Sequence, residues 1–142
     1  NSYSNIIKKS TNIFFHGPVP KAELQKHMRN YHVGIHLSRF DAYSLAVGEM
    51  IGCGLPVIVS TNTGNKDDVE NEMLGLVTDL SMPAVSEAIE KITNAEYYNE
   101  FIDSIDSYVK NRNRSYGERM LEFYKNLKDG QSAARKAQEI YL

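Results

Sequence analysis

Short apolar runs alternate with segments of helical spacing along the first two thirds of the chain. The runs end at glycine, proline or polar turn-forming residues, which is the pattern of strands buried in a parallel sheet. We therefore predict strands at these runs, which are Ile13–Phe15, His32–Leu37, Pro56–Ser60 and Leu74–Val77.

The segments between these runs have the spacing of helices. Lys21–Asn30 carries apolar residues at three- and four-residue steps, as an amphipathic helix does, and Leu45–Gly52 is small and mostly apolar. A third helix is predicted from Met82 onward, and Ser4–Ser10 indicates the end of an earlier one. Strands that alternate with helices predict an α/β fold, in which helices cover both faces of a parallel sheet.

The strand pattern stops after Asn94. Apolar residues then recur at helical steps through Phe101, Ile105 and Tyr108, and two further helices are predicted at Tyr116–Leu127 and from about Ser132. We therefore expect one domain over residues 1–94 and a helical tail over residues 95–142 that packs on the same domain.

Composition narrows the class of protein. The 142 residues are 42% hydrophobic and 24% charged, which fits a globular domain. A net charge of −2 gives no basic field for nucleic acid. The single cysteine, Cys53, excludes an intrachain disulfide, and no apolar run approaches the roughly 20 residues of a membrane span. We expect a cytoplasmic location, and because position 1 is Asn rather than Met, a piece of a longer protein.

Histidine and acidic residues do not form a metal-binding pattern. The four histidines show neither a His-Glu-Xaa-Xaa-His motif nor pairing with cysteine at zinc spacing. Asp-Xaa-Asp does not occur either. We therefore expect no metal site; the histidines considered are His16, His27, His32 and His36.

Ligands of an open parallel sheet bind beyond the carboxyl ends of its strands, near helix N-termini. The loops expected there are His16–Pro20, Ser38–Ser44 and Thr61–Lys66, of which the second is richest in polar groups. Asp41 and Glu49 flank the helix start, where a ligand with sugar hydroxyls could meet both carboxylates. From spacing alone the alternative stays open that Asp41 caps a loop and Glu49 is a solvated helix residue.

The run from Ser38 to Ile58 resembles the signature of a large family of retaining glycosyltransferases with the GT-B fold, the group 1 glycosyltransferases. In that signature an acid, seven residues and a Glu precede a Gly-Xaa-Pro-Val strand entry, here Asp41, Glu49 and Gly54-Leu55-Pro56-Val57. The resemblance covers about residues 5–92 and includes three more segments in order, which are Ile13–Val19, Asn62–Asp67 and Gly75–Val77. It implies part of the Rossmann-like, donor-binding C-terminal half of a GT-B fold.

The resemblance also implies roles for individual residues. Asp41, the residue assigned to catalysis, would face the donor sugar and the reacting centre and position the sugar, and Glu49 would bind the ribose hydroxyls of the nucleotide. The backbone amides at Tyr43, Ser44 and Leu45 would meet the diphosphate. A loop containing Gly17 and Val19 would lie against the nucleobase.

Two residues depart from the family pattern. The first acid is usually Glu, so Asp41 is one methylene shorter and is expected to shift the donor sugar or to alter its identity. Tyr43-Ser44 stands where Phe-Gly is common, which alters the phosphate contacts.

The function implied by the resemblance is transfer, with retention, of a hexose from a UDP- or GDP-sugar to a glycan or lipid-linked acceptor in polysaccharide biosynthesis. No cofactor and no metal ion are expected. An Arg, a Lys and the acceptor-binding N-terminal domain are expected before Asn1, so this chain alone should be inactive. A lipid-linked acceptor would bring the parent protein to the inner face of the membrane as a peripheral protein.

Two other functions remain open at this point. One is another GT-B enzyme, such as a nucleotide-sugar epimerase, whose acid–base residues this stretch does not display. The other is a non-catalytic nucleotide-binding or interaction domain that kept the fold, in which Asp41 and Glu49 would be dispensable.

Overall fold

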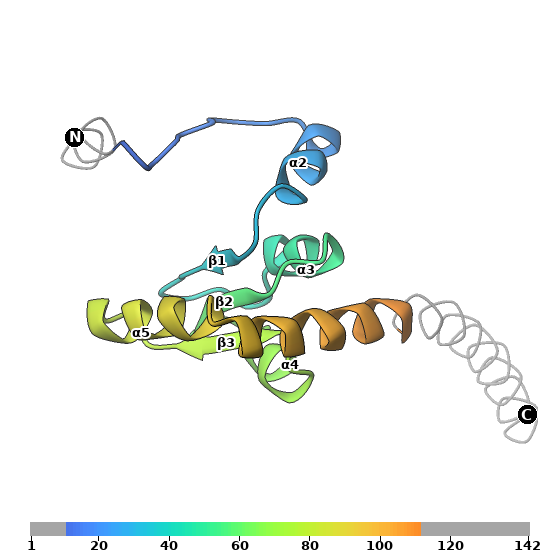
Figure 1. The fold of residues 1–142 in the computed structure, drawn as a ribbon. Helices are drawn as coiled ribbons and strands as arrows, with labels where there is room; N and C mark the ends of the chain where they lie inside the picture. The colour runs from blue at the N-terminus through green and yellow to red at the C-terminus, as the bar shows by residue number, and fades with distance from the viewer. Residues whose placement is uncertain (1–10, 112–142) are drawn as a thin grey trace, which may run out of the picture.

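The computed structural model describes residues 11–111, which form an α/β domain around a three-stranded parallel sheet (Figure 1). The strands run in the order β1 (Gly34–His36), β2 (Val57–Ser60) and β3 (Gly75–Thr78). Ile35 of β1 is paired with Ile58 of β2, and Ile58 is paired with Leu76 of β3. Each strand leads into a helix, which is the connection that parallel pairing requires.

The central strand β2 is buried on both faces, and its alternating side chains feed two separate cores. Val57 and Val59 pack toward α3 (Leu45–Gly52) and α4 (Lys66–Asn71). Ile58 points the other way, toward Ala88 and Ile92 of α5 (Met82–Ile92). Helices therefore cover both faces of a parallel sheet, as the sequence predicts.

The close packing of α3 on β1 depends on a glycine. A Cβ placed on Gly34 would lie 2.5 Å from the sulfur of Met50, which is shorter than any ordinary contact. Gly34 therefore lets the apolar side of α3 approach the strand, and this fixes where the N-terminus of α3 lies.

Residues 95–111 form a further helix, which confirms the predicted helical segment after Asn94. Its Phe101 joins the core beside α5, and its Ile105 joins the core beside α3 and α4. The division of the chain at residue 94 stays a prediction. The segments Ser4–Ser10, Tyr116–Leu127 and the helix from about Ser132 lie outside the described residues.

The predicted strand Ile13–Phe15 is wrong. The segment has no regular structure, and Phe14 and Phe15 are 77% and 80% exposed. In Figure 1 it runs away from the sheet toward α2 (Lys21–Met28). Among residues 11–111 no strand lies beside it to exchange hydrogen bonds, and an apolar run becomes a strand only when it has such a partner.

Helix α4 was not expected from the sequence, because its six residues include a single buried apolar side chain, Val69. Asp67 and Asp68 lie in its first turn, where carboxylates interact favourably with the helix N-terminus.

Within residues 11–111, no helix combines the length and apolar character that crossing a membrane requires.

Candidate functional site

The candidate site lies beyond the carboxyl ends of β1 and β2, where two loops run side by side. The backbone N–H of Asp41 donates to the carbonyl of Asn62 at 3.1 Å, and the N–H of Gly64 donates to the carbonyl of Asp41 at 2.8 Å. These bonds form an isolated parallel bridge between Asp41 and Thr63. Asp41 is thus held by its backbone as firmly as a strand residue.

Buried hydroxyl groups join the same two loops beneath Asp41. The Ser60 hydroxyl accepts from the N–H of Ser38 at 3.0 Å and donates to the carbonyl of Ser38 at 2.6 Å. Since its only proton is used there, the Thr63 hydroxyl, 3.0 Å away, must be the donor to Ser60. Both hydroxyls are almost fully buried. The loop that begins at Ser38 therefore packs on buried polar groups that all have hydrogen-bond partners.

Ser44 sets the start of α3. Its side chain accepts from the N–H of Val47 at 3.5 Å, as an N-cap does, while its own N–H donates to the Oδ1 atom of buried Asn65 at 2.6 Å. The first turn of α3 contains no acidic residue. The positive partial charge of its N–H groups is therefore not neutralised from within the helix and suits an anion.

The carboxylate of Asp41 contacts a histidine. His36 Nε2 lies 3.0 Å from Asp41 Oδ2, and the two side chains are 24% and 29% exposed. An ionised carboxylate only accepts hydrogen bonds, so Nε2 is the donor. From the sequence His36 was a candidate only for a metal site or acid–base role, and only the fold shows that the end of β1 faces Asp41.

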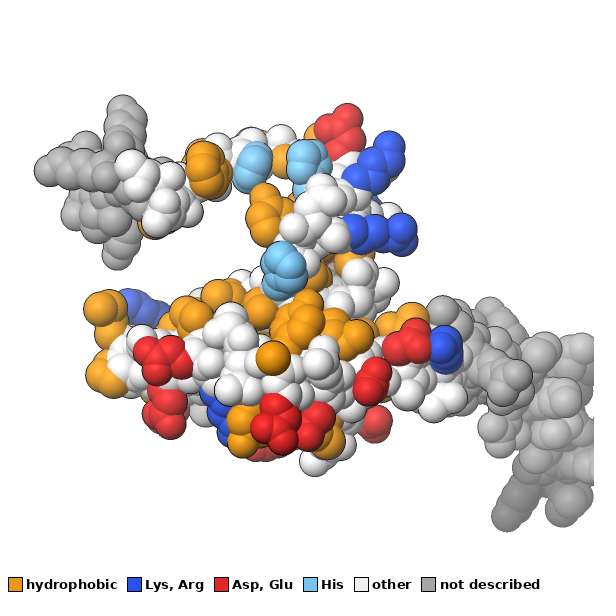
Figure 2. Space-filling view, in the orientation of Figure 1, with side chains coloured by type: hydrophobic (Ala, Val, Ile, Leu, Met, Phe, Trp, Pro, Cys, Tyr) orange, Lys and Arg blue, Asp and Glu red, His pale blue; other side chains and the backbone are white. Residues whose placement is uncertain are grey.

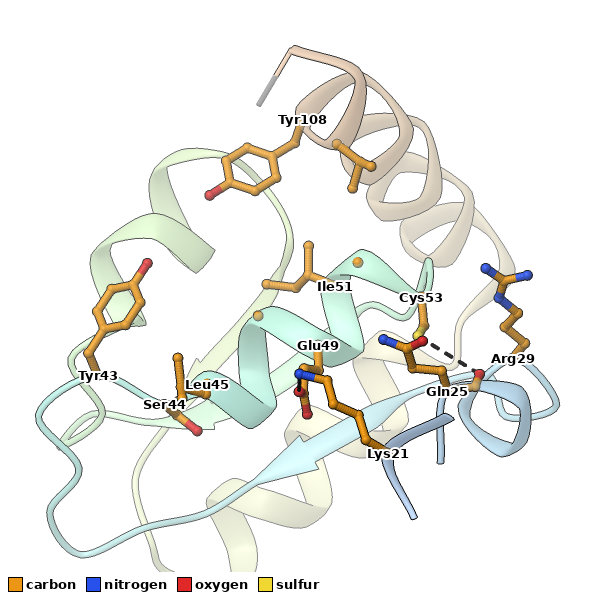
Figure 3. Close-up of a pocket in the computed structure, with 13 residues that line it drawn as sticks. Lys21, Gln25, Arg29, Tyr43, Ser44, Leu45, Glu49, Ile51, Cys53 and Tyr108 are labelled. Carbon is orange, nitrogen blue, oxygen red and sulfur yellow. Dashed lines mark hydrogen bonds and ion pairs between the residues drawn. The ribbon is translucent and has the colours of Figure 1, made fainter. Parts of the chain in front are cut away.

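Glu49 lies on the second turn of α3 and is paired with a lysine. Lys21 Nζ, at the start of α2, is 2.9 Å from Glu49 Oε1 (Figure 3). The hydrogen bond to Glu49, and then the attraction of its negative charge, raise the pKa of Lys21 above its ordinary value of 10.5. Nothing in the hydrophobic pattern had singled out Lys21.

A cavity of about 510 Å³ opens along α3, between α2 and the helix of residues 95–111 (Figure 3). Small-molecule sites occupy about 300–1,000 Å³, so its size fits a ligand. Gly48 and Gly52 leave the α3 wall open, and Lys21 and Arg29 supply positive charge from α2. Figure 2 shows Lys and Arg side chains gathered over α2, whereas acidic side chains gather on the side of α4.

The structure brings together most of the residues named from the sequence, with three exceptions. Four of them share the wall of the cavity and are Tyr43, Ser44, Leu45 and Glu49. Asp41, Gly17 and Val19 do not line this cavity. Gly17, with φ of +67°, lies with Val19 in the segment before α2, and the roles assigned to all seven residues stay predictions.

One further hydrogen bond involves a residue of the cavity wall. The hydroxyl of Tyr43 donates to Asp68 Oδ2 of α4 at 3.1 Å, which ties the loop before α3 to the next helix. Over the part of the chain that the structure describes, no three His, Cys, Asp or Glu side chains are grouped closely enough to hold a metal ion.

Comparison with known proteins supports the resemblance seen in the sequence. The family described as "Glycosyl transferases group 1" has a sequence model that matches residues 4–113, which include Asp41, Glu49 and the other candidate site residues. A search of curated proteins finds no match.

Proposed function

Since the chain belongs to the group 1 glycosyltransferases, we propose that its described domain binds the nucleotide-sugar donor of the transfer reaction. The donor is a UDP- or GDP-sugar, and its hexose passes with retention to a glycan or a lipid-linked acceptor. The acceptor site and the basic residues that assist the departing diphosphate lie on parts of a longer protein. The alternatives are a nucleotide-sugar epimerase and a non-catalytic binding domain, and the second of them predicts nucleotide binding without preference for a sugar conjugate.

The observation that carries this proposal is the position of the α3 N-terminus between two carboxylates. The helix start, capped by Ser44 and free of acidic residues in its first turn, offers N–H groups to a diphosphate. Glu49, four residues into the helix, suits the paired hydroxyls of a ribose. Asp41, on the loop before the helix, is placed for the hydroxyls of the sugar.

The chemistry assigned to these groups is the stabilisation of a leaving diphosphate. The bond between the anomeric carbon and the diphosphate oxygen breaks, and the acceptor oxygen bonds to the same face of that carbon. The proton of the acceptor hydroxyl passes to the departing diphosphate oxygen. Fixed N–H donors at the helix start stabilise the negative charge that develops there, which is usually the largest catalytic contribution of such a site.

Metal-independent transfer, a cytoplasmic location and a role in polysaccharide biosynthesis are parts of the same proposal. When the acceptor is lipid-linked, the parent protein works as a peripheral protein at the inner face of the membrane. Isolated from its acceptor domain, the chain binds the donor without transferring the sugar.

Calorimetry with the 142-residue chain tests the proposal. UDP, GDP, ADP and their sugar conjugates are titrated into the wild type, Glu49→Ala and the control Glu87→Ala, which removes an exposed carboxylate of α5. We expect one nucleotide to bind the wild type and the control equally, and Glu49→Ala to weaken it at least about tenfold. Equal binding by all three proteins contradicts the assignment of Glu49. Binding of nucleotides without preference for any sugar conjugate supports the non-catalytic alternative.

A further inference from the structure

The contact between His36 and Asp41 has no role in the function proposed so far. We propose that His36 is a positioning residue for Asp41: its Nε2–H binds one carboxylate oxygen and leaves the other directed toward the donor sugar. This inference rests on the proposed donor-binding function and assigns the group that orients its reactive-centre carboxylate. In this proposal His36 affects the binding of the donor sugar, whereas α3 binds the nucleotide.

Both ends of the contact are fixed by backbone hydrogen bonds that do not involve the two side chains. His36 is the last residue of β1 and is in register with Val59 of β2. Asp41 is held by its bridge to Thr63. The 3.0 Å distance between the side chains therefore follows from the positions of two anchored residues.

The short loop between the two residues is closed by its own hydrogen bonds. The hydroxyl of Ser38 donates to the carbonyl of Phe40 at 2.9 Å and lies 3.2 Å from the Phe40 N–H. On its other side the loop presses against Gly64, where a Cβ would lie 1.7 Å from the carbonyl oxygen of Ala42. The loop therefore has no room to shift, and the backbone from which the Asp41 side chain extends is held in place.

The side chain of Asp41 is short, and this brings its carboxylate within reach of a hydrogen-bond donor at the end of β1. A group 1 family member usually carries Glu at this position, and the aspartate side chain is shorter by one methylene, which holds the carboxylate close to the end of β1. His36 is the ionisable side chain that meets it there; β2 carries no ionisable residue, and neither does the turn of residues 61–65. A carboxylate has two acceptor oxygens, and His36 uses Oδ2 alone.

Burial is intermediate, which suits a positioning contact. At 24% and 29% exposure the pair is shielded enough for a charge-assisted hydrogen bond to hold its geometry, and open enough for Asp41 to meet a ligand. A contact made only for stability would affect the nucleotide and the sugar alike, because α3 and Asp41 share the same supporting loop. The two explanations therefore differ in a measurable way.

The first test is an NMR spectrum of the imidazole N–H protons of the whole chain at neutral pH. A ring N–H that donates to a carboxylate exchanges slowly with water, so we expect an Nε2–H signal from His36 in the wild type and none in Asp41→Ala. His27, which makes no carboxylate contact among residues 11–111, provides the reference. Absence of the signal in the wild type, or its persistence in Asp41→Ala, overturns the proposal.

The second test compares the affinities of a nucleotide and its sugar conjugate by calorimetry. For His36→Leu we expect the sugar conjugate to bind about tenfold more weakly and the bare nucleotide to change less than about twofold. His36→Gln, which keeps an N–H donor at similar reach, should restore the affinity to within about threefold. His27→Leu controls for the loss of a histidine and should change neither affinity.

Three results count against the proposal. Equal weakening of nucleotide and sugar conjugate by His36→Leu shows a merely structural role. Unchanged affinity for both in His36→Leu removes the role of His36 and leaves the donor site intact. A wild-type chain that binds the nucleotide but gains nothing from the sugar overturns this inference together with the assignment of Asp41 in the proposed function.

Discussion

Lys21 Nζ lies 2.9 Å from Glu49 Oε1, so the carboxylate assigned to the ribose already has a cationic partner. The lysine side chain is 73% exposed and comes from α2, whereas Glu49 belongs to α3, and both residues line the cavity. The lysine occupies Oε1 alone, so a ribose that takes both oxygens of Glu49 must share Oε1 with the lysine or displace it. The lysine and the ligand therefore compete at Oε1.

Removal of the lysine should strengthen nucleotide binding. In Lys21→Met the carboxylate of Glu49 is free before binding, and because exposed ion pairs contribute little, we expect an affinity gain of about two- to threefold. Lys26→Met on the same helix is the matched control. A loss of affinity in Lys21→Met, measured by calorimetry, would show that the lysine itself contacts the nucleotide.

The pH dependence of the pair follows from the raised pKa of Lys21. A group whose pKa is raised by folding stabilises the folded state fully when the pH is below its unfolded pKa, here 10.5. This stabilisation disappears as the pH rises through the folded pKa. The lysine–glutamate contact should therefore persist through the neutral range. NMR of the Lys21 side chain across alkaline pH checks this; titration of Lys21 at or below its ordinary pKa of 10.5 contradicts it.

Loss of the Ser44 cap should affect both stability and binding. Ser44→Ala removes the acceptor for Val47 N–H at the start of α3, which costs about 1 kcal/mol of unfolding free energy. In a domain of this size that lowers the melting temperature by roughly 4–8 °C. We also expect weaker nucleotide binding, because the N–H groups of the first turn lose their fixed direction.

A second serine cap separates these two effects. Ser81 caps α5 in the same way, accepting from the N–H of Ala84 at 3.4 Å, but lies on the other side of the sheet. Ser81→Ala should lower the melting temperature to a similar extent and leave nucleotide affinity unchanged. Equal binding by the two variants would remove the start of α3 from the donor site.

Substitution of two glycines should have opposite effects on stability. Gly64→Ala places a Cβ 1.7 Å from the carbonyl oxygen of Ala42, and such overpacking costs about 1–3 kcal/mol or more. Gly48→Ala meets no atom within 4 Å and removes a glycine from α3, which should stabilise the domain by about 0.5–1 kcal/mol. Urea denaturation of both variants measures the difference; a Gly64→Ala protein as stable as the wild type would contradict the close packing of the two loops.

Periodicity alone located the elements whose own side chains fill the core. The boundaries of Leu45–Gly52 agree with α3, and Pro56–Ser60 contains β2, because apolar residues dominate both segments. Parallel pairing followed from the alternation of strands and helices. The loops at the carboxyl edge of the sheet, and hence the neighbourhood of Asp41 and Ser44, could be predicted for the same reason.

Elements that depend on a partner could not be predicted in the same way. Ile13–Phe15 has the residues of a strand, but no neighbouring strand among residues 11–111 accepts its hydrogen bonds. Lys66–Asn71 is helical although it is mostly charged, since burial of Val69 and bonds at its ends are enough for one short helix. The local sequence pattern indicates which secondary structure a segment favours, and contacts with neighbouring elements decide whether that structure forms.

The sequence by itself determined the α/β fold, the parallel sheet and the acid pair Asp41 and Glu49 around one helix start. Only the tertiary structure decided which side chains those acids meet. His36 reaches Asp41 because the sheet and the Thr63 bridge fix both backbones, and Lys21 reaches Glu49 because α2 and α3 border the same cavity. Such contacts depend on distances between separate elements, and those distances are set when the core packs.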